Sequence, residues 1–216
     1  MEDFVLMKRI EHKDEGLSGI ENAREYASIH EGQAKMMYGP FLKDIKALNP
    51  KGRCLEVGAG PGIMTCLFAE ANPDLHITAF DISTDMATVA KERIRDRGLD
   101  DRIDYLVCDA NSEEDVKKLG KFDLVYSIYS LHHWDDPKKC ISNLFGAIKD
   151  DGILFIGDLK RVWWLYYLPV KSRDIEQIKA AYMSREIKEM ISGNGIAQYK
   201  IRALFPFFLQ SVVINH

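Results

Sequence analysis

The chain has 216 residues, of which 46% are apolar and 29% charged, and it carries a net charge of −4. A chain of this length and composition can bury a sizeable core without disulfides or metals, which excludes a disordered protein, a collagen, a coiled coil and a disulfide miniprotein. Proteins that hold DNA or RNA by its backbone are usually basic, so we expect no nucleic-acid partner.

The sequence gives no sign of export or of a membrane span. We find no run of 18 apolar residues, so we expect no transmembrane helix. The first residues lack the positive and apolar regions of a signal peptide, which favours a cytoplasmic protein. The four cysteines form no CxxC pair and no zinc pattern, so we predict reduced, buried thiols at Cys54, Cys66, Cys108 and Cys140.

The first 50 residues are expected to form two helices. Ser18 and Glu21 have the spacing of a capping box, which predicts a helix that begins near Gly19. A second helix should end at 49–52, where Asn-Pro-Lys-Gly is a typical stop signal.

Short apolar segments alternate with segments of helical period after Gly52. The predicted strands are 54–57, 77–80, 103–107, 124–128 and 153–156, and the predicted helices are 63–71, 85–97, 113–119 and 138–149. This alternation predicts a parallel sheet with crossover helices. A helix at 184–192 then precedes two strands, 197–204 and 207–214, which are too close in sequence to pair other than antiparallel. The predicted fold class is α/β, with five parallel strands finished by an antiparallel hairpin.

Three glycines follow the first predicted strand, at Gly58, Gly60 and Gly62. Glycines let the backbone approach a ligand closely, and the next helix points its amides and its positive dipole end at that ligand. Dinucleotide sites use the spacing GxGxxG, whereas here a single residue precedes the third glycine. The spacing therefore disfavours a nicotinamide-dependent oxidoreductase.

Acidic residues end the next two strands. Asp81 can accept hydrogen bonds from both hydroxyls of a ribose, as the acid of dinucleotide folds does. Ile82 and Met86 can pack against an adenine or ribose, although ordinary helix packing explains Met86 nearly as well. Asp109 and Ala110 end the third strand.

The order Glu56-x-Gly58-x-Gly60-x-Gly62 resembles motif I of the class I S-adenosylmethionine-dependent methyltransferases. In that family an acid after the third strand meets the adenine amino group and the next amide meets a ring nitrogen, and Asp109-Ala110 matches that position. Residues 122–127 resemble the family's fourth strand, and 128–137 resemble the small-molecule branch that includes the quinone-ring (UbiE-like) enzymes. The Asp-Asp-Gly at 150–152 departs from the usual Pro-Gly-Gly, which is a variation in a turn.

The resemblance implies a Rossmann-like, doubly wound, mostly parallel seven-stranded sheet with an antiparallel C-terminal hairpin. It implies one domain, with an N-terminal helical lid (1–50), a cofactor-binding core (51–160) and a substrate-side segment (161–216). S-adenosylmethionine is the implied cofactor, and a small molecule, hydrophobic or aromatic in one reading, is the implied acceptor. The implied cofactor contacts are Glu56, Gly58, Ala59, Gly60, Gly62, Asp81, Ile82, Met86, Asp109, Ala110 and Ser127.

Methyl transfer depends mainly on in-line positioning, and it needs a base only when the acceptor has a proton to lose. His132 and His133 follow the fourth strand and are candidate bases, although each can instead cap or pack the loop. Asp158 ends the fifth strand and either orients the substrate or pairs with Arg161. Tyr26 is a candidate contact from the lid, with core packing as its alternative.

Other branches of the family are disfavoured. Residues 127–130 read Ser-Ile-Tyr-Ser, not the Asn/Asp-Pro-Pro-Tyr/Phe of enzymes that act on nucleic-acid bases. Protein-arginine enzymes carry two glutamates after the fourth strand, and we see no such pair. Asp135, Asp136 and Asp158 suggest a metal only weakly, because Asp-Asp-Pro is typical of a helix N-terminus, and we predict no metal.

Residues 162–169 are mostly aromatic or large and apolar, with Trp163-Trp164-Leu165-Tyr166-Tyr167 at their centre. An exposed patch of this kind marks a ligand, partner or membrane contact, and a helix docked under the sheet edge explains the pattern equally well. Arg161, Lys171 and Arg173 flank it and can meet an anionic group. Peripheral membrane contact, a homodimer and a non-catalytic cofactor-binding module that regulates a partner stay open as alternatives.

Overall fold

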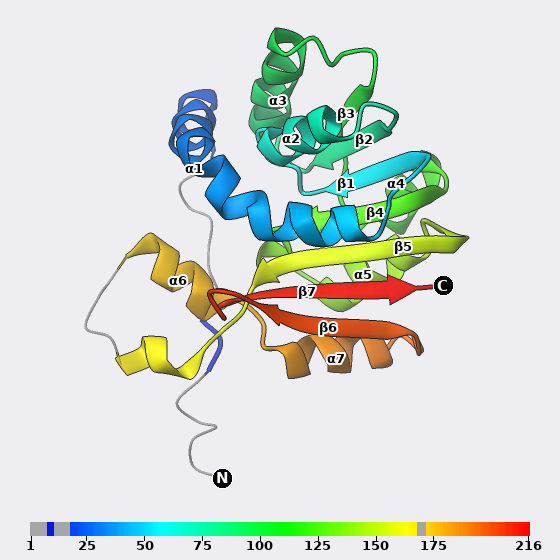
Figure 1. Ribbon diagram of the computed structural model, residues 1–216. Coiled ribbons are helices and arrows are strands. Elements are labelled where there is room, and N and C mark those ends of the chain that lie inside the picture. The colour runs from blue at the N-terminus through cyan, green and yellow to red at the C-terminus, as the bar shows by residue number, and fades with distance from the viewer. Residues whose placement is uncertain (1–7, 11–17, 168–171) are drawn as a thin grey trace.

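Seven strands form one sheet in the order β3-β2-β1-β4-β5-β7-β6 (Figure 1). The computed structural model describes residues 8–10, 18–167 and 172–216. The strands are β1 (Arg53–Val57), β2 (His76–Asp81), β3 (Ile103–Val107), β4 (Phe122–Ile128), β5 (Ile148–Leu159), β6 (Tyr199–Leu204) and β7 (Leu209–Asn215). The first five strands pair in parallel, and β7 lies antiparallel between β5 and β6. The predicted fold class, with its antiparallel hairpin, is confirmed.

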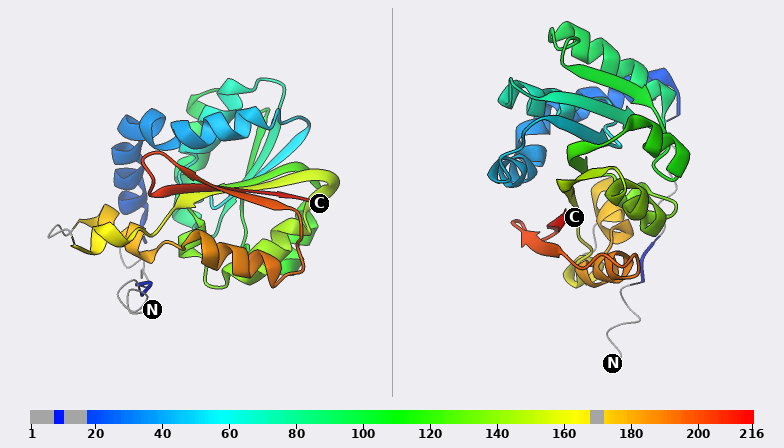
Figure 2. Two further views of the ribbon diagram at one scale, coloured as in Figure 1. Left: turned by 60° about the horizontal axis from the view of Figure 1, so that its bottom comes forward. Right: turned by 90° about the vertical axis from the view of Figure 1, so that its right-hand side faces the viewer.

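Helices cover both faces of the sheet (Figures 1 and 2). They are α1 (Ile20–Ala47), α2 (Ile63–Ala71), α3 (Thr84–Asp96), α4 (Glu113–Leu119), α5 (Pro137–Phe145), α6 (Arg173–Ala180) and α7 (Ser184–Ser192). Buried side chains of α1, α2 and α3 form one large cluster with one face of the sheet. Those of α4, α5 and α7 form a second cluster on the other face. The sheet therefore separates two cores, as parallel strands rich in branched and aromatic residues require.

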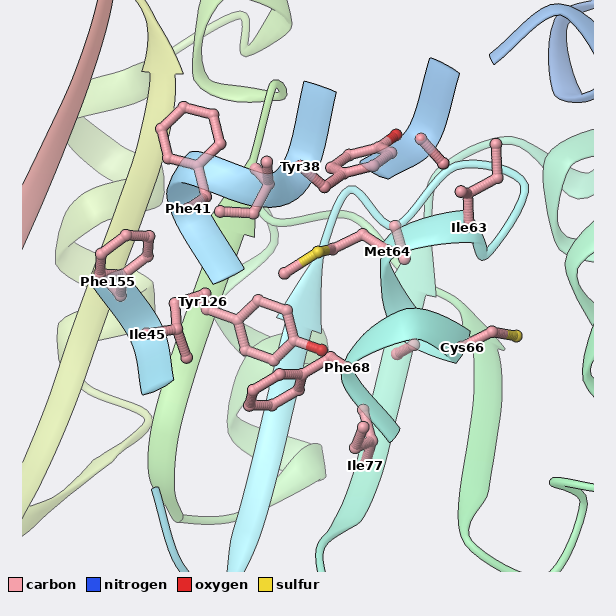
Figure 3. Packing of buried hydrophobic residues seen from close by; sticks show 14 of the residues in the cluster. Tyr38, Phe41, Ile45, Ile63, Met64, Cys66, Phe68, Ile77, Tyr126 and Phe155 are labelled. Carbon is pink, nitrogen blue, oxygen red and sulfur yellow. The ribbon is translucent and has the colours of Figure 1, made fainter. Parts of the chain in front are cut away.

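The first cluster contains large aromatic side chains from the helix layer and the sheet (Figure 3). Phe68 of α2 meets Tyr126 of β4 edge to face, with ring centroids 5.0 Å apart. Gly157 of β5 has no room for a side chain, because an added Cβ would overlap the Phe41 ring of α1. This close approach seats the second half of α1 directly on the strand.

The N-terminal region differs from the prediction, since one helix of 28 residues replaces the two expected ones. Gly19 is the N-cap residue and no side chain caps the helix, so the predicted capping box at Ser18 is absent. The apolar positions keep a helical period from Ala23 to Ile45, which buries one continuous stripe and outweighs the internal Pro40. Helix α1 changes direction along its length, so that its first half lies beside α3 and its second half crosses β4 and β5 (Figure 1).

The elements on either side of β5 also differ from the prediction. Helix α5 ends at Phe145 rather than at 149, because β5 already begins at Ile148. The sequence pattern predicted no helix at the position of α6, and it did not define the 3-10 turn η3 (Trp163–Tyr167). The start of α5 follows the prediction, since Asp136 accepts the Lys139 amide and Pro137 is the first helical residue.

Candidate functional site

The glycine loop after β1 holds three residues in the left-handed region, with φ of 67° at Gly58, 53° at Gly60 and 73° at Gly62. A Cβ at Gly58 would overlap the Ser130 side chain, so this glycine lets the loop touch the segment after β4. A Cβ at Gly60 would meet nothing within 4 Å. The loop therefore presents open space at Gly60, which a close-fitting ligand can use.

Asp81, at the end of β2, holds this loop in place. Its Oδ2 accepts the Gly60 amide at 2.9 Å, and its Oδ1 accepts the Ser83 amide at 2.9 Å. Burial raises the pKa of Asp81, while the two amide hydrogen bonds act in the opposite direction. Each carboxylate oxygen still has a lone pair for a hydroxyl donor such as a ribose.

Glu56 lies beneath the glycine loop and is almost fully buried. The Tyr126 hydroxyl donates to Glu56 Oε2 at 2.8 Å. Burial raises the pKa of Glu56 to about 7, against the lowering effect of its hydrogen bonds. A buried carboxyl of this kind is poised to ionise when a cationic group arrives.

The segment after β3 is fixed from both sides. Asp109 Oδ1 accepts the Asn111 amide at 2.8 Å, and the Ala110 carbonyl accepts Asn143 Nδ2 at 2.9 Å. These bonds set the Asp109 carboxylate and the Ala110 amide at the same edge of the sheet as Asp81.

A cavity of about 410 Å³ joins these groups. Eleven of the fifteen predicted site residues line it: Tyr26, Glu56, Gly58, Ala59, Gly60, Asp81, Ile82, Met86, Asp109, Ala110 and His133. The structure does not bring the other four to its wall. Gly62 is the N-cap of α2, Ser127 is fully buried in β4, and His132 and Asp158 are buried behind His133.

The far wall of the cavity is aromatic, with Tyr26 and Tyr38 from α1 and Tyr129 and Trp134 from the segment after β4. The Tyr129 hydroxyl donates to the Met37 carbonyl at 2.9 Å, and its ring meets Phe41 edge to face with centroids 5.1 Å apart. Burial raises the pKa of Tyr38 far above its usual range. Sequence reasoning assigned no role to Tyr129. Its φ of 56° is unusual for a residue other than glycine, and nothing in the sequence signals it.

His132 and Asp158 form a buried pair. Asp158 Oδ1 lies 2.7 Å from His132 Nδ1, and Asp158 Oδ2 accepts the His132 amide at 3.0 Å. Because a carboxylate only accepts, the pair places the imidazole proton on Nδ1. The expected alternative partner of Asp158 was wrong: Arg161 is itself buried and donates to Glu186 at 2.6 Å.

Three consecutive carbonyls between α6 and α7 are held by side chains from distant parts of the chain. Arg9 donates to Ala180 and also to the His132 carbonyl. Arg161 donates to the Ala181 carbonyl, and Gln210 of β7 donates to that of Tyr182. This network supports the histidine turn η2 (Leu131–His133), and no sequence pattern pointed to Arg9.

The aromatic segment after β5 forms η3, in which Leu165 is buried whereas Trp163 and Tyr167 are 62% and 67% exposed. Packing under the sheet edge therefore explains the buried Leu165 but not the exposed Trp163 and Tyr167. Arg161 is not available to an anionic group, and Lys171 lies outside the described residues.

The four cysteines are free and buried, as predicted, and burial raises the pKa of each thiol. Over the described ranges, His, Cys, Asp and Glu side chains form no group of three that could hold a metal ion. Within the same ranges, every helix is too short or too polar to cross a bilayer.

Known proteins share sequence and fold with the part of the chain that carries this site. Residues 55–154 match the family described as "Methyltransferase domain". This part of the chain is therefore similar to methyltransferase domains. The seven-stranded sheet has the fold of solved S-adenosylmethionine-dependent methyltransferases.

Two curated relatives and one solved structure illustrate the likeness. The malonyl-[acyl-carrier protein] O-methyltransferase of Acetivibrio thermocellus is 32% identical over 62% of this chain and 44% of its own length. The ubiquinone/menaquinone biosynthesis C-methyltransferase UbiE of Vibrio campbellii is 27% identical over 58% of this chain and 48% of its own length. A SAM-dependent methyltransferase from Aquifex aeolicus superposes with a TM-score of 0.72 at 18% identity, covering 89% of this chain and 97% of that one.

The chain thus matches less than half of the length of those two curated relatives. The structural likeness, at 18% identity, establishes the fold alone.

Proposed function

We propose that the chain is a methyltransferase that uses S-adenosylmethionine to methylate a small molecule. The observation that carries the proposal is the cavity beside Gly60, where open space, the Asp81 carboxylate and two further acids converge. These groups fit S-adenosylmethionine, since a ribose needs acceptors, a cationic methionine end needs an acid and an adenine needs a polar edge. The activity would reside in a single domain, in which α1 lies over the cavity as a lid.

The cofactor supplies an activated methyl on a sulfonium, and the chain supplies position. Asp81 would hold the ribose, Asp109 and the Ala110 amide the adenine, and Glu56 the cationic amino group. Gly58 and Gly60 would allow the backbone close approach, and Ile82 and Met86 would pack against the nucleoside. The aromatic wall would then face the acceptor and exclude water, which makes in-line positioning the main source of acceleration.

His133 is the candidate base, because it lines the cavity whereas His132 does not. The rings of the two histidines lie 4.0 Å apart, centroid to centroid. Asp158 and His132 would therefore act as positioning residues that hold η2, and Tyr26 would contact the acceptor from α1. Gly62 and Ser127 would contribute through the shape of the loop and of β4 rather than by contact.

Ligand-induced thermal stabilisation tests the proposal. S-adenosylmethionine and S-adenosylhomocysteine, each at about 100 times its Kd, should add about 2.7 kcal/mol of stability, and NAD should add none. Gly60→Ala should abolish that shift because its Cβ enters the cavity. Gly98→Ala is the matched control, since Gly98 has a similar φ of 64° and equally open space but lies outside the cavity. A shift with NAD alone would contradict the proposal, and cofactor binding without any methylated product would favour a binding module.

The cellular setting is also a proposal. Four buried, free thiols are typical of a reducing compartment, so we propose a cytoplasmic location. Exposed Trp163 and Tyr167 support peripheral membrane contact, which co-sedimentation with lipid vesicles tests. A homodimer stays a prediction that light scattering tests.

A further inference from the structure

Arg93, on α3, is a buried cation with hydrogen-bond donors to spare. Its Nη2 atom donates to Glu31 of α1 at 3.2 Å, and only 11% of its side chain is exposed. Its Nε and Nη1 atoms are buried and have no hydrogen-bond partner among the residues that the structure describes. Leaving the N–H groups of a charged side chain buried and unpaired is costly, so an anion near this side of Arg93 reduces that cost.

Tyr38 of α1 connects Arg93 to the cavity. The tyrosine lines the cavity and is 8% exposed, and its hydroxyl points away from Phe41 (Figure 3). Burial raises the pKa of its phenol far above the usual range, Glu56 raises it further and Arg93 lowers it. Coulomb interactions fall off with distance, so the Tyr38 hydroxyl lies close to a carboxyl group and to a guanidinium at once.

The cofactor end that we propose for this part of the cavity carries two charges of opposite sign. Its amino group and its carboxylate are bonded to the same carbon, so an amino group held by Glu56 brings the carboxylate to the same part of the wall. Beside Glu56 alone, that carboxylate would meet a like charge and lose its hydration, which is costly. It therefore needs a hydrogen-bond donor and a compensating cation, and Tyr38 and Arg93 are groups of these two kinds that lie close together.

We propose that Tyr38 and Arg93 bind the carboxylate of the amino-acid end of the cofactor. The Tyr38 hydroxyl donates a hydrogen bond to the carboxylate, and Arg93, which does not itself line the cavity, supplies the compensating charge from behind Tyr38. This rests on the proposed methyltransferase function and specifies how its cofactor is recognised. Tyr38 is then the member of the aromatic wall that lies next to the cofactor, and α1 takes part in cofactor binding.

A purely structural role for Arg93 is the alternative, because this arginine also joins α3 to α1. Arg97, at the C-terminal end of α3, separates the two roles. It donates to the same Glu31 at 3.0 Å and to Glu70 of α2 at 2.7 Å, whereas the arginine whose charge acts on Tyr38 is Arg93. Removing the Arg97 guanidinium therefore breaks a contact between α1 and α3 and leaves the charge behind Tyr38 in place.

Two ligands that differ only in the carboxylate test the proposal. S-adenosylhomocysteine carries it, and 5′-S-(3-aminopropyl)-5′-thioadenosine has a hydrogen in its place and keeps the amine, the thioether and the nucleoside. Calorimetry on the full chain should show S-adenosylhomocysteine binding at least about tenfold more tightly, as expected for a charge-assisted hydrogen bond. Equal affinities for the two ligands would overturn the proposal. Failure of both ligands to bind would instead overturn the proposed function.

Variants of three residues locate the carboxylate contact. Tyr38→Phe and Arg93→Gln should each weaken S-adenosylhomocysteine binding about tenfold and leave binding of the decarboxylated analogue within about twofold. Arg93→Lys keeps the charge and should retain most of the difference between the two ligands.

Arg97→Gln is the matched control and should leave the ratio of the two affinities unchanged. An equal loss of both ligands in Arg93→Gln, or the same change of ratio in Arg97→Gln, would mean that Arg93 acts only through the packing of α1 on α3, and it would overturn the proposal. An unchanged ratio in Tyr38→Phe, which retains both arginines, would overturn it as well, even if Arg93→Gln fails to fold.

Discussion

The two walls of the cavity are built by different means. The wall that we propose for the cofactor, called the cofactor wall, consists of backbone and strand-end acids, with Asp81 joining the ends of β1 and β2 through the Gly60 amide. The wall that we propose for the acceptor, called the acceptor wall, consists of side chains from α1 and from the segment after β4, joined by the bond from Tyr129 to the Met37 carbonyl. The first wall depends on local geometry that adjacent parallel strands enforce, whereas the second depends on packing between distant segments. We expect the two walls to respond separately to mutation.

Removing the charge of Asp158 should damage the acceptor wall most. Asp158 accepts from both the ring and the amide of His132, and in Asp158→Asn the new side-chain amide group faces one of these buried donors, which loses its acceptor at a cost of about 3 kcal/mol. Urea unfolding measures the loss. Protein that remains folded at low temperature should bind S-adenosylhomocysteine within about twofold of the original, and a selective loss of that binding would contradict the separation of the walls.

Gly58→Ala tests the junction between the two walls. The added Cβ collides with Ser130 in a backbone conformation that only glycine adopts without strain, and strain plus overpacking should cost about 3 kcal/mol. Gly98→Ala carries the strain without the collision and should cost about 1 kcal/mol. Equal losses in the two variants, measured by urea unfolding, would show that the contact with Ser130 is unimportant.

Glu56 should make the stability of the cofactor wall depend on pH. Its pKa of about 7 in the folded chain lies above the ordinary value of 4.5, so its contribution is complete below about pH 4.5 and is lost as the pH rises through 7. The difference amounts to about 3 kcal/mol at most. Unfolding free energies of the ligand-free protein between pH 5 and pH 8 should show this decline, and Glu56→Gln should flatten it.

Binding of the cofactor should show the opposite slope. The ionised carboxylate of Glu56 attracts a cationic amino group, so affinity for S-adenosylhomocysteine should rise over the range in which ligand-free stability falls. Parallel slopes for stability and affinity would argue against contact between Glu56 and the amino group.

The contacts between α1 and α3 should have the smallest effect. Glu31 accepts hydrogen bonds from Arg93 and Arg97 at 3.2 and 3.0 Å, and such partly exposed pairs contribute less than about 1 kcal/mol. Glu31→Gln should therefore lower stability slightly, and Glu25→Gln, an exposed control on the same helix, should not. A loss of several kcal/mol would mean that the two helices are coupled far more tightly than their surface contacts imply.

Sequence reasoning grouped the residues of the proposed cofactor wall for a physical reason. The spacing of Gly58, Gly60 and Asp81 is set by the strand–turn–helix unit itself, so the chemistry follows from neighbours in the chain. Most of the predicted lining residues belong to these units, and they do meet in one cavity.

The acceptor wall was harder to predict, because its contacts are made across the fold. Nothing near Asp158 in the sequence selects His132 over Arg161, and only the packing of α7 assigns Arg161 to Glu186. The number of N-terminal helices was predicted wrongly for a similar reason. A buried stripe that packs first on α3 and then on the sheet stabilises α1 through Pro40, and a local stop signal carries no information about that stripe.

The three carbonyls held by Arg9, Arg161 and Gln210 also bear on the order of assembly. They tie together positions separated by as many as 171 residues in the chain. Closing loops of that size is entropically costly and slow, whereas the glycine loop and its acid need only two neighbouring strands. The half of the molecule that contains the glycine loop should therefore fold early, and the half that these three carbonyls hold together should be completed last, once β7 has been inserted.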